Sequence, residues 1–168
     1  GYDSAGIGII NSETKTINCN KAEGKLKNLI DTLNDKDIPG TVGIGHTRWA
    51  THGKPEVKNA HPHIDSSGTI AVVQNGIIEN FQDLKNKLEK EGIIFNSDTD
   101  TEVIPHLIKR ELNTLSKLNL ENNGSTLLVA VRNVISDLEG SYALAVLWSG
   151  APTSLVVARR QAPLIIGL

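Results

Sequence analysis

Residues 46–53, which read His-Thr-Arg-Trp-Ala-Thr-His-Gly, bring more chemistry together than any other part of the chain. This octapeptide follows the apolar stretch 41–45 and precedes a Gly/Pro breaker at 53–55. A strand that ends in a dense polar cluster is suited to holding a small charged ligand, because an arginine grips a carboxylate through two parallel N–H···O bonds. The alternative for Arg48 is an ordinary ion pair in a surface loop.

Two weaker signals gain meaning beside the octapeptide. Asn75-Gly76 follows an apolar run, and Asn-Gly in that setting is a strong hairpin signal. The alternative is an oxyanion hole formed by the Asn75 amide and the Gly76 N–H, in which one donor stabilises a transition state by about 3 kcal/mol. Asp100 either complements the dipole of a helix that starts near it or binds an ammonium group. In the second case Arg48 and Asp100 would hold the two ends of an α-amino acid.

Motifs for common cofactors are incomplete. The sequences at 6–8 and 43–45 open like dinucleotide loops, but Asn11 and Arg48 stand where the third glycine belongs. Neither cysteine nor carboxylate accompanies the histidines at the spacing of zinc ligands. The histidines concerned are His46, His52, His61 and His63. We therefore expect neither a cofactor nor a metal.

Composition excludes several classes of partner. The chain has 168 residues and a net charge of −2, and no more than two basic residues are adjacent, so a nucleic-acid footprint is not expected. Its longest apolar runs are about five residues, whereas a membrane span needs about 20. The single cysteine, Cys19, precludes an internal disulfide and is typical of a reducing compartment. We expect a cytoplasmic protein.

The elements that must position these residues alternate between strand and helix. The periodicity predicts a hairpin at 11–14, a capping box formed by Thr99 and Glu102, and a layered α/β or α+β domain with largely antiparallel strands and helices outside. Strands are expected at 5–10, 15–19, 41–47, 69–73, 93–95, 142–148, 154–158 and 164–166, and helices over 26–33, 77–92, 103–108 and 127–138. The chain starts without Met and stops inside an apolar run, so we expect a fragment cut at both ends.

Five motifs together resemble a known family. They are Gly-Tyr-Asp-Ser-Ala-Gly at 1–6, the octapeptide at 46–53, Asn-Ala-His-Pro at 59–62, Asn-Gly-Ile-Ile-Glu-Asn at 75–80 and Thr-Asp-Thr-Glu at 99–102. In this order they resemble the glutaminase domain of the glutamine–fructose-6-phosphate aminotransferase family, over essentially the whole chain. The resemblance implies a class II amidotransferase with the N-terminal-nucleophile hydrolase fold, an α+β fold in which two antiparallel sheets lie between helix layers.

The resemblance also implies how glutamine is held. Arg48 would bind the α-carboxylate, and Asp100 would bind the α-amino group. Trp49, Thr51 and His52 would lie on a loop that orders over bound glutamine and shields it from water. These roles agree with the ligand clamp inferred from the residues themselves.

The same resemblance implies that Asn75 and Gly76 form the oxyanion hole. This chain departs from the family pattern at two points. The family's nucleophile is an N-terminal cysteine whose own α-amino group is the general base, and the family places it before the Gly-Tyr-Asp-Ser motif with which this chain begins. Cys19 lies in a predicted strand, has no free amine and is expected to be a small hydrophobe. Gln74 stands where the family most often has His, and a glutamine still donates and accepts hydrogen bonds.

The sequence therefore predicts that residues 1–168 are a glutaminase domain that lacks its nucleophile segment and the sugar-isomerase domains that follow. The complete enzyme would hydrolyse L-glutamine and transfer ammonia to fructose 6-phosphate, giving glucosamine 6-phosphate and glutamate, and we expect it to be a homodimer. The fragment alone is expected to be inactive. The alternatives are the glutaminase domain of an enzyme of the amidophosphoribosyltransferase type and a non-catalytic glutamine-binding module.

Overall fold

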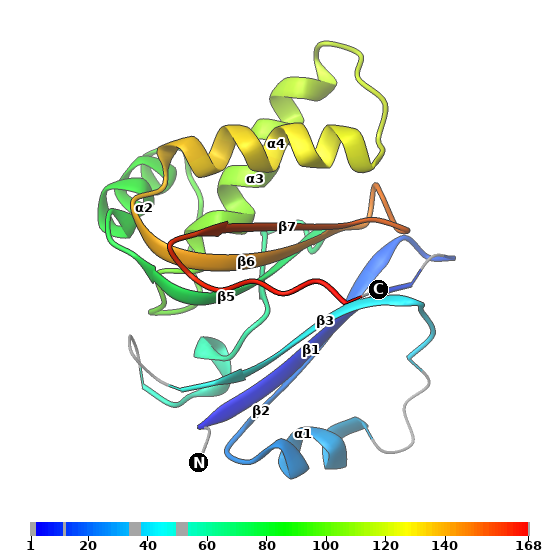
Figure 1. Cartoon of the computed structure of the whole chain (residues 1–168), viewed down its shortest axis with the longest axis vertical. Helices are drawn as coiled ribbons and strands as arrows, with labels where there is room; N and C mark the ends of the chain where they lie inside the picture. Colours follow the sequence, from blue (N-terminus) through cyan, green and yellow to red (C-terminus); the bar gives the residue numbers. More distant parts are fainter. Residues whose placement is uncertain (1–2, 12, 34–37, 50–53, 168) are drawn as a thin grey trace.

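In the computed structural model, which describes residues 3–11, 13–33, 38–49 and 54–167, two antiparallel sheets pack face to face. Helices cover the outer face of each sheet (Figure 1). The order of layers is therefore helix, sheet, sheet, helix. This arrangement agrees with the α+β sandwich expected from the sequence.

The first sheet has the strand order β2-β1-β3. Its strands are β1 (Ser4–Asn11), β2 (Thr16–Glu23) and β3 (Val42–Arg48), and α1 (Leu26–Leu33) covers it. The predicted turn between the first two strands is confirmed, because Asn11 Oδ1 accepts the backbone N–H groups of Glu13 and Thr14 at 2.9 and 3.1 Å. Register pairs Ser4 with Arg48, which places the start of β1 beside the end of β3.

The second sheet has the strand order β4-β5-β6-β7. Its strands are β4 (His63–Ile64), β5 (Ile70–Ile78), β6 (Gly140–Trp148) and β7 (Leu155–Arg160). A short 3₁₀ turn, η1 (Val57–Asn59), precedes β4. The outer helices are α2 (Phe81–Lys90), α3 (Val103–Ser116) and α4 (Gly124–Asp137). Among the described residues, no helix is long and apolar enough to cross a membrane.

Apolar side chains fill each space between layers in the described part of the chain. The largest cluster joins the second sheet to its helices and includes Ile104, Leu127 and Tyr142. A smaller cluster between the sheets includes Ile44 from β3 and Val73 from β5. This contact between sheets is what brings the polar end of β3 against β5.

One sequence signal proves wrong where it matters most for the site. Asn75-Gly76 does not form a hairpin, because β5 continues through it and pairs with β6 as far as Ile78, opposite Gly140. The predicted helix therefore begins at Phe81, not at Ile77. Long-range pairing with β6 has overridden the local turn preference, as tertiary context does with short signals.

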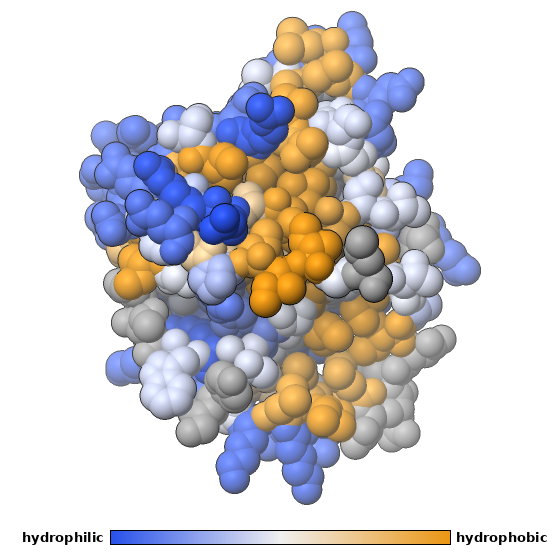
Figure 2. All heavy atoms as spheres, viewed as in Figure 1, coloured by the Kyte–Doolittle hydropathy of each residue, from blue (hydrophilic) through white to orange (hydrophobic). Residues whose placement is uncertain are grey.

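Three other local expectations also fail. Residues 93–95 form no strand; Ile94 is 78% exposed, and the Phe95 ring packs against His106. The run 164–166 is neither a strand nor buried, since Ile165 is 92% exposed. In Figure 1 this last segment runs across the face in view. Figure 2, drawn from the same side, shows apolar surface gathered across the middle of that face.

The third expectation that fails is the capping box formed by Thr99 and Glu102. Glu102 does not cap α3 with Thr99, since no side-chain cap bond is formed there. The Glu102 carboxylate instead accepts the backbone N–H groups of Asn96 and Ser97 at 2.8 and 2.7 Å. The chain before α3 wraps around this carboxylate, and the wrapping sets the position of Asp100.

Candidate active site

A cavity of about 470 Å³ opens where the end of β3, the middle of β5 and the segment before α3 meet. Its lining residues are His46, Thr47, Arg48, Trp49, His61, Gln74, Asn75, Gly76, Ile77, Thr99 and Asp100. The structure thus brings together Arg48, Trp49, Asn75, Gly76 and Asp100 from three distant stretches of the sequence. Thr51 and His52 lie outside the described residues.

Arg48 is the last residue of β3 and is only 4% exposed. Its Nη1 lies 3.5 Å from Asp3 Oδ1 and 3.4 Å from the carbonyl oxygen of Lys54. The backbone N–H of Asp3 also donates to the Arg48 carbonyl at 3.0 Å. Arg48 therefore forms an ion pair with Asp3, as the alternative interpretation of this residue expected. The pair holds a buried guanidinium at the cavity wall.

Asp100 lies on the segment that precedes α3 and is 4% exposed. Its Oδ2 accepts the backbone N–H of Ile78, the last residue of β5, at 2.7 Å. Because α3 begins at Val103, Asp100 is outside the first turn of the helix. The carboxylate is therefore fixed to the end of a strand while it lines the cavity, which suits a carboxylate that binds a cationic group.

Asn75 lies in β5 with its side chain exposed to the cavity. Its Oδ1 is 2.8 Å from His46 Nε2. An amide oxygen only accepts, so the His46 ring must donate from Nε2 in this contact. The Nδ2 donors of Asn75 then remain for a ligand oxygen, as an oxyanion hole requires.

Gly76 has a backbone φ of +118°, which favours glycine, and a Cβ at this position would collide with the Ser141 carbonyl. The glycine lets β5 pass close to β6 at the cavity. The sequence motif Asn75-Gly76 thus marks a stretch of strand beside the site that requires glycine, where the hairpin signal predicted a turn.

Gln74 lines the cavity but is only 4% exposed. Its Oε1 accepts the Thr101 hydroxyl, and its backbone N–H donates to His61 Nδ1 at 3.2 Å. Its side-chain Nε2 has no hydrogen-bond partner among the described residues. An unpaired buried donor at a cavity wall is unfavourable unless a ligand satisfies it.

Three histidine rings contact one another at the cavity wall, with His46 stacked on His61 and His63 edge-on to His61. The rings of His46 and His61 lie 4.3 Å apart, and those of His61 and His63 lie 4.8 Å apart. Burial lowers the pKa of His46, and burial together with the charges of neighbouring groups lowers the pKa of His61 well below its usual range. Burial and the nearby Lys21 charge lower the pKa of His63 to about 3. These rings are therefore neutral at pH 7.

A buried carboxylate orders the segment that carries Asp100. Burial alone would raise the pKa of Glu102, but hydrogen bonds from His106, Asn96 and Ser97 lower it to about 2. The Ser97 hydroxyl adds a hydrogen bond to this carboxylate at 2.5 Å.

Among the described residues, no group of three His, Cys, Asp or Glu side chains is arranged to hold a metal ion.

The sequence named Arg48, Asn75, Gly76 and Asp100, which line this cavity, but assigned no role to the residues that contact them. His46, His61 and Asn59 belong to the quoted motifs, so their position in those motifs was the available signal. Thr101 also lies within a motif, and its contact with Gln74 follows only from the folded structure.

Solved structures with a similar fold define the class. Glutamine phosphoribosylpyrophosphate (PRPP) amidotransferase from B. subtilis, complexed with ADP and GMP, is 29% identical, with a TM-score of 0.71 over 95% of this chain and 31% of that one. A structure described as the allosteric regulatory enzyme of purine biosynthesis is 30% identical, with a TM-score of 0.73 and the same coverage. The chain has the fold of an N-terminal-nucleophile amidotransferase.

The sequence comparisons narrow the class to a family. The family model for the glutamine amidotransferase domain matches residues 46–166, and the chain belongs to this family. Glutamine–fructose-6-phosphate aminotransferase (isomerizing) from Thermosynechococcus vestitus is 53% identical over 99% of this chain. The enzyme of the same name from Pyrococcus horikoshii is 52% identical over the whole chain. The chain spans about a quarter of the length of these relatives, 25% and 26%. The fold and the family expected from the sequence are confirmed.

Proposed function

We propose that this chain is the glutaminase unit of an enzyme that hydrolyses L-glutamine and transfers the ammonia to fructose 6-phosphate. The products are glutamate and glucosamine 6-phosphate. The observation that carries the proposal is that a buried cation, Arg48, and a buried anion, Asp100, line one cavity together with Asn75 and Gly76. The sequence supports the proposal, because 53% and 52% of aligned residues are identical in two relatives that carry the aminotransferase name.

The cavity suits a zwitterionic amino acid. Arg48 binds the α-carboxylate, and Asp100 binds the α-ammonium group, each through charge-assisted hydrogen bonds. A volume of about 470 Å³ is in the usual range for small-molecule sites. Trp49, which is 70% exposed at the cavity rim, covers the bound ligand together with Thr51 and His52.

The side-chain amide of glutamine is the group that reacts. A cysteine thiolate supplied by a segment that precedes this chain attacks the amide carbon, and its α-amino group takes and delivers the proton. The Asn75 amide and the Gly76 N–H stabilise the developing oxyanion. The C–N bond breaks to release ammonia and leave a thioester, which water hydrolyses to glutamate.

Cys19 is not that nucleophile. It is absent from the residues that line the cavity, and its Sγ lies 4.0 Å from the carbonyl of Pro62. Burial raises the pKa of Cys19, which keeps it as the less nucleophilic thiol. Residues 1–168 alone are therefore expected to hydrolyse no glutamine.

The complete protein would carry sugar-isomerase domains after this unit, act as a homodimer and work in the cytoplasm. Its partners are L-glutamine and fructose 6-phosphate, with no nucleic acid or membrane. Identity of about half to the aminotransferase relatives, against 29% to PRPP amidotransferase, favours the sugar as ammonia acceptor.

Glutamate release by the full-length protein tests the proposal. We expect release that rises when fructose 6-phosphate is present and does not respond to phosphoribosylpyrophosphate. Arg48→Ala should lower kcat/KM by roughly 30-fold or more, which corresponds to ~2 kcal/mol, because the substrate carboxylate loses its charged partner. A full-length protein that hydrolyses no glutamine would refute the assignment. Dependence on phosphoribosylpyrophosphate would instead select the other amidotransferase.

A further inference from the structure

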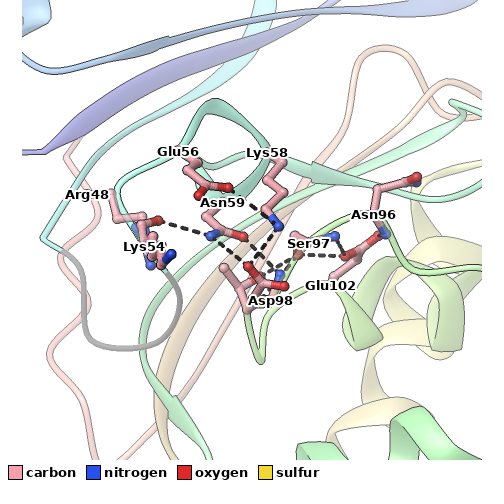
Figure 3. A network of polar contacts seen from close by, with 10 residues as sticks. Arg48, Lys54, Glu56, Lys58, Asn59, Asn96, Ser97, Asp98 and Glu102 are labelled. Carbon is pink, nitrogen blue, oxygen red and sulfur yellow. Dashed lines mark hydrogen bonds and ion pairs between the residues drawn. The ribbon is translucent and has the colours of Figure 1, made fainter.

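Asn59 is completely buried, yet it is absent from the residues that line the cavity. It ends the short turn η1, and its side chain lies between the segment after Arg48 and the segment before Asp100 (Figure 3). We propose that Asn59 is the positioning residue that sets the separation of the two charged ends of the glutamine clamp. This inference rests on the function proposed above.

One side of the Asn59 amide holds the Arg48 segment. Its Nδ2 donates to the carbonyl oxygen of Lys54 at 3.0 Å. The same carbonyl accepts Arg48 Nη1 at 3.4 Å. One backbone oxygen therefore joins Asn59 to the guanidinium that would bind the substrate carboxylate.

The other side of the amide holds the Asp100 segment. Asn59 Oδ1 accepts the backbone N–H of Asp98 at 2.9 Å, and Nδ2 lies 3.3 Å from Asp98 Oδ2. Asp98 is two residues before Asp100. Hydrogen bonds between Ser97 and Glu102 at 2.7 and 2.5 Å close the short segment that contains both residues. A shift of Asp98 is therefore transmitted to Asp100.

Only an amide of this size meets both demands. Asn59 uses its N–H donors on Lys54 and Asp98 and its oxygen on the Asp98 N–H. Aspartate would keep the acceptor but would place a carboxylate against two oxygens, and alanine would leave buried partners unsatisfied.

Lys58 offers a matched control on the same partner. Its Nζ lies 2.9 Å from Asp98 Oδ2 and 3.4 Å from Glu56 Oε2, and its side chain is 44% exposed. An exposed ion pair of this kind contributes little, because water screens it. Lys58→Ala therefore removes a charged contact to Asp98 but leaves the buried bridge through Asn59.

The test compares two competitive ligands in the full-length protein proposed above. L-Glutamate has both charged ends of the substrate, whereas glutarate lacks the α-amino group. The inhibition constant of glutarate divided by that of L-glutamate measures how well Asp100 engages an amino group while Arg48 holds the carboxylate. We expect Asn59→Asp and Asn59→Ala to lower this ratio about tenfold and to raise the KM for glutamine about tenfold, with kcat within about threefold of the wild type.

The Lys58→Ala protein should keep the ratio within about twofold of the wild type. An unchanged ratio in either folded Asn59 variant, or an equal fall in Lys58→Ala, would overturn the inference. Where Asn59→Ala does not fold, Asn59→Asp decides, and unfolding of both variants would also count against a positioning role. A wild-type protein that hydrolyses no glutamine refutes the proposed function, whereas an active protein with unmoved ratios refutes only the role of Asn59.

Discussion

The Nε2 atom of His46 lies 2.8 Å from the Oδ1 atom of Asn75 and determines which end of the amide faces the cavity. Burial lowers the pKa of His46, so its ring is neutral at pH 7 and carries one proton. That proton is on Nε2, because the amide oxygen only accepts. The Asn75 Nδ2 is thereby left to donate to a substrate oxygen.

Loss of the His46 ring should therefore impair catalysis more than binding. We expect His46→Ala to lower kcat for glutamine hydrolysis about tenfold, with KM within about twofold, because a misoriented oxyanion donor loses part of the 10²–10³-fold that one donor contributes. His46→Gln, which keeps an N–H donor, should recover part of the loss. Steady-state kinetics of both variants make the comparison, and a rise in KM at constant kcat would show that His46 serves binding instead.

The sequence alone located polar residues at the ends of the elements. The octapeptide placed Arg48 at the end of a strand, and the spacing of alternating elements indicated a layered domain with largely antiparallel strands and helices outside. The arrangement in two sheets was implied only by the family resemblance. Such patterns are local, since they depend on side-chain period and on turn residues. The positions of Asn75 and Asp100 at one cavity followed from the resemblance and were then found in the structure.

The part of the site geometry that the sequence did not predict depends on contacts between distant segments. Asn75-Gly76 carries a hairpin signal, but pairing with β6 and the bond from the Ile78 N–H to Asp100 keep it in a strand. The bridge made by Asn59 and the satisfied carboxylate of Glu102 join stretches that no local pattern connects. Side-chain hydrogen bonds of this kind have no periodicity, so the sequence offered no signal for their partners.

The buried histidines should make the fold sensitive to acid. His63 has a folded-state pKa of about 3, and burial also holds the pKa of His61 well below the ordinary 6.5. The unfolded chain therefore binds more protons below pH 6.5, and stability falls as pH decreases from about 6.5 towards 3. We expect the His63 ring to remove about 1.4 kcal/mol of unfolding free energy between pH 7.5 and pH 5.5, and the lowered pKa values of His46 and His61 to add to this loss.

Urea unfolding at the two pH values, followed by fluorescence of the buried Trp148, measures this difference. His63→Gln should reduce the loss between pH 7.5 and pH 5.5 by about 1.4 kcal/mol, because the contribution of this ring is removed. Equal stability of the wild type at both pH values would contradict the burial of neutral rings.

Trp49 should report ligand binding directly. Its side chain is 70% exposed at the cavity rim, whereas Trp148 is 7% exposed and lies in the core beside the helices. Contact of the Trp49 indole with bound ligand should shift emission to shorter wavelength when L-glutamate is titrated into the full-length protein. Trp49→Phe should abolish the shift. A shift that persists in this variant would assign the signal to another part of the protein.

Gly76 should tolerate no side chain. Its φ of +118° and the collision of a Cβ with the Ser141 carbonyl predict that Gly76→Ala loses about 2 kcal/mol or more of unfolding free energy. Gly45→Ala is the control, because its Cβ would lie 3.7 Å from the nearest carbonyl oxygen, at ordinary contact distance. Denaturant unfolding of the two variants should separate them clearly. Equal stability would mean that β5 relaxes at Gly76 at little cost.

Replacement of Asp100 by Asn separates its charge from its structural bond. An asparagine oxygen can still accept the Ile78 N–H that Asp100 Oδ2 accepts at 2.7 Å, so the end of β5 should stay in place. The missing negative charge should raise the KM for glutamine by roughly 10–100-fold, since a charge-assisted hydrogen bond contributes about 1.5–3 kcal/mol. Asp98→Asn, on the same segment but exposed, should change KM by less than about threefold. Because glutarate lacks the amino group, its inhibition constant should be the same in Asp100→Asn and the wild type. Weaker inhibition by glutarate in this variant would place the defect at the Arg48 end of the cavity instead.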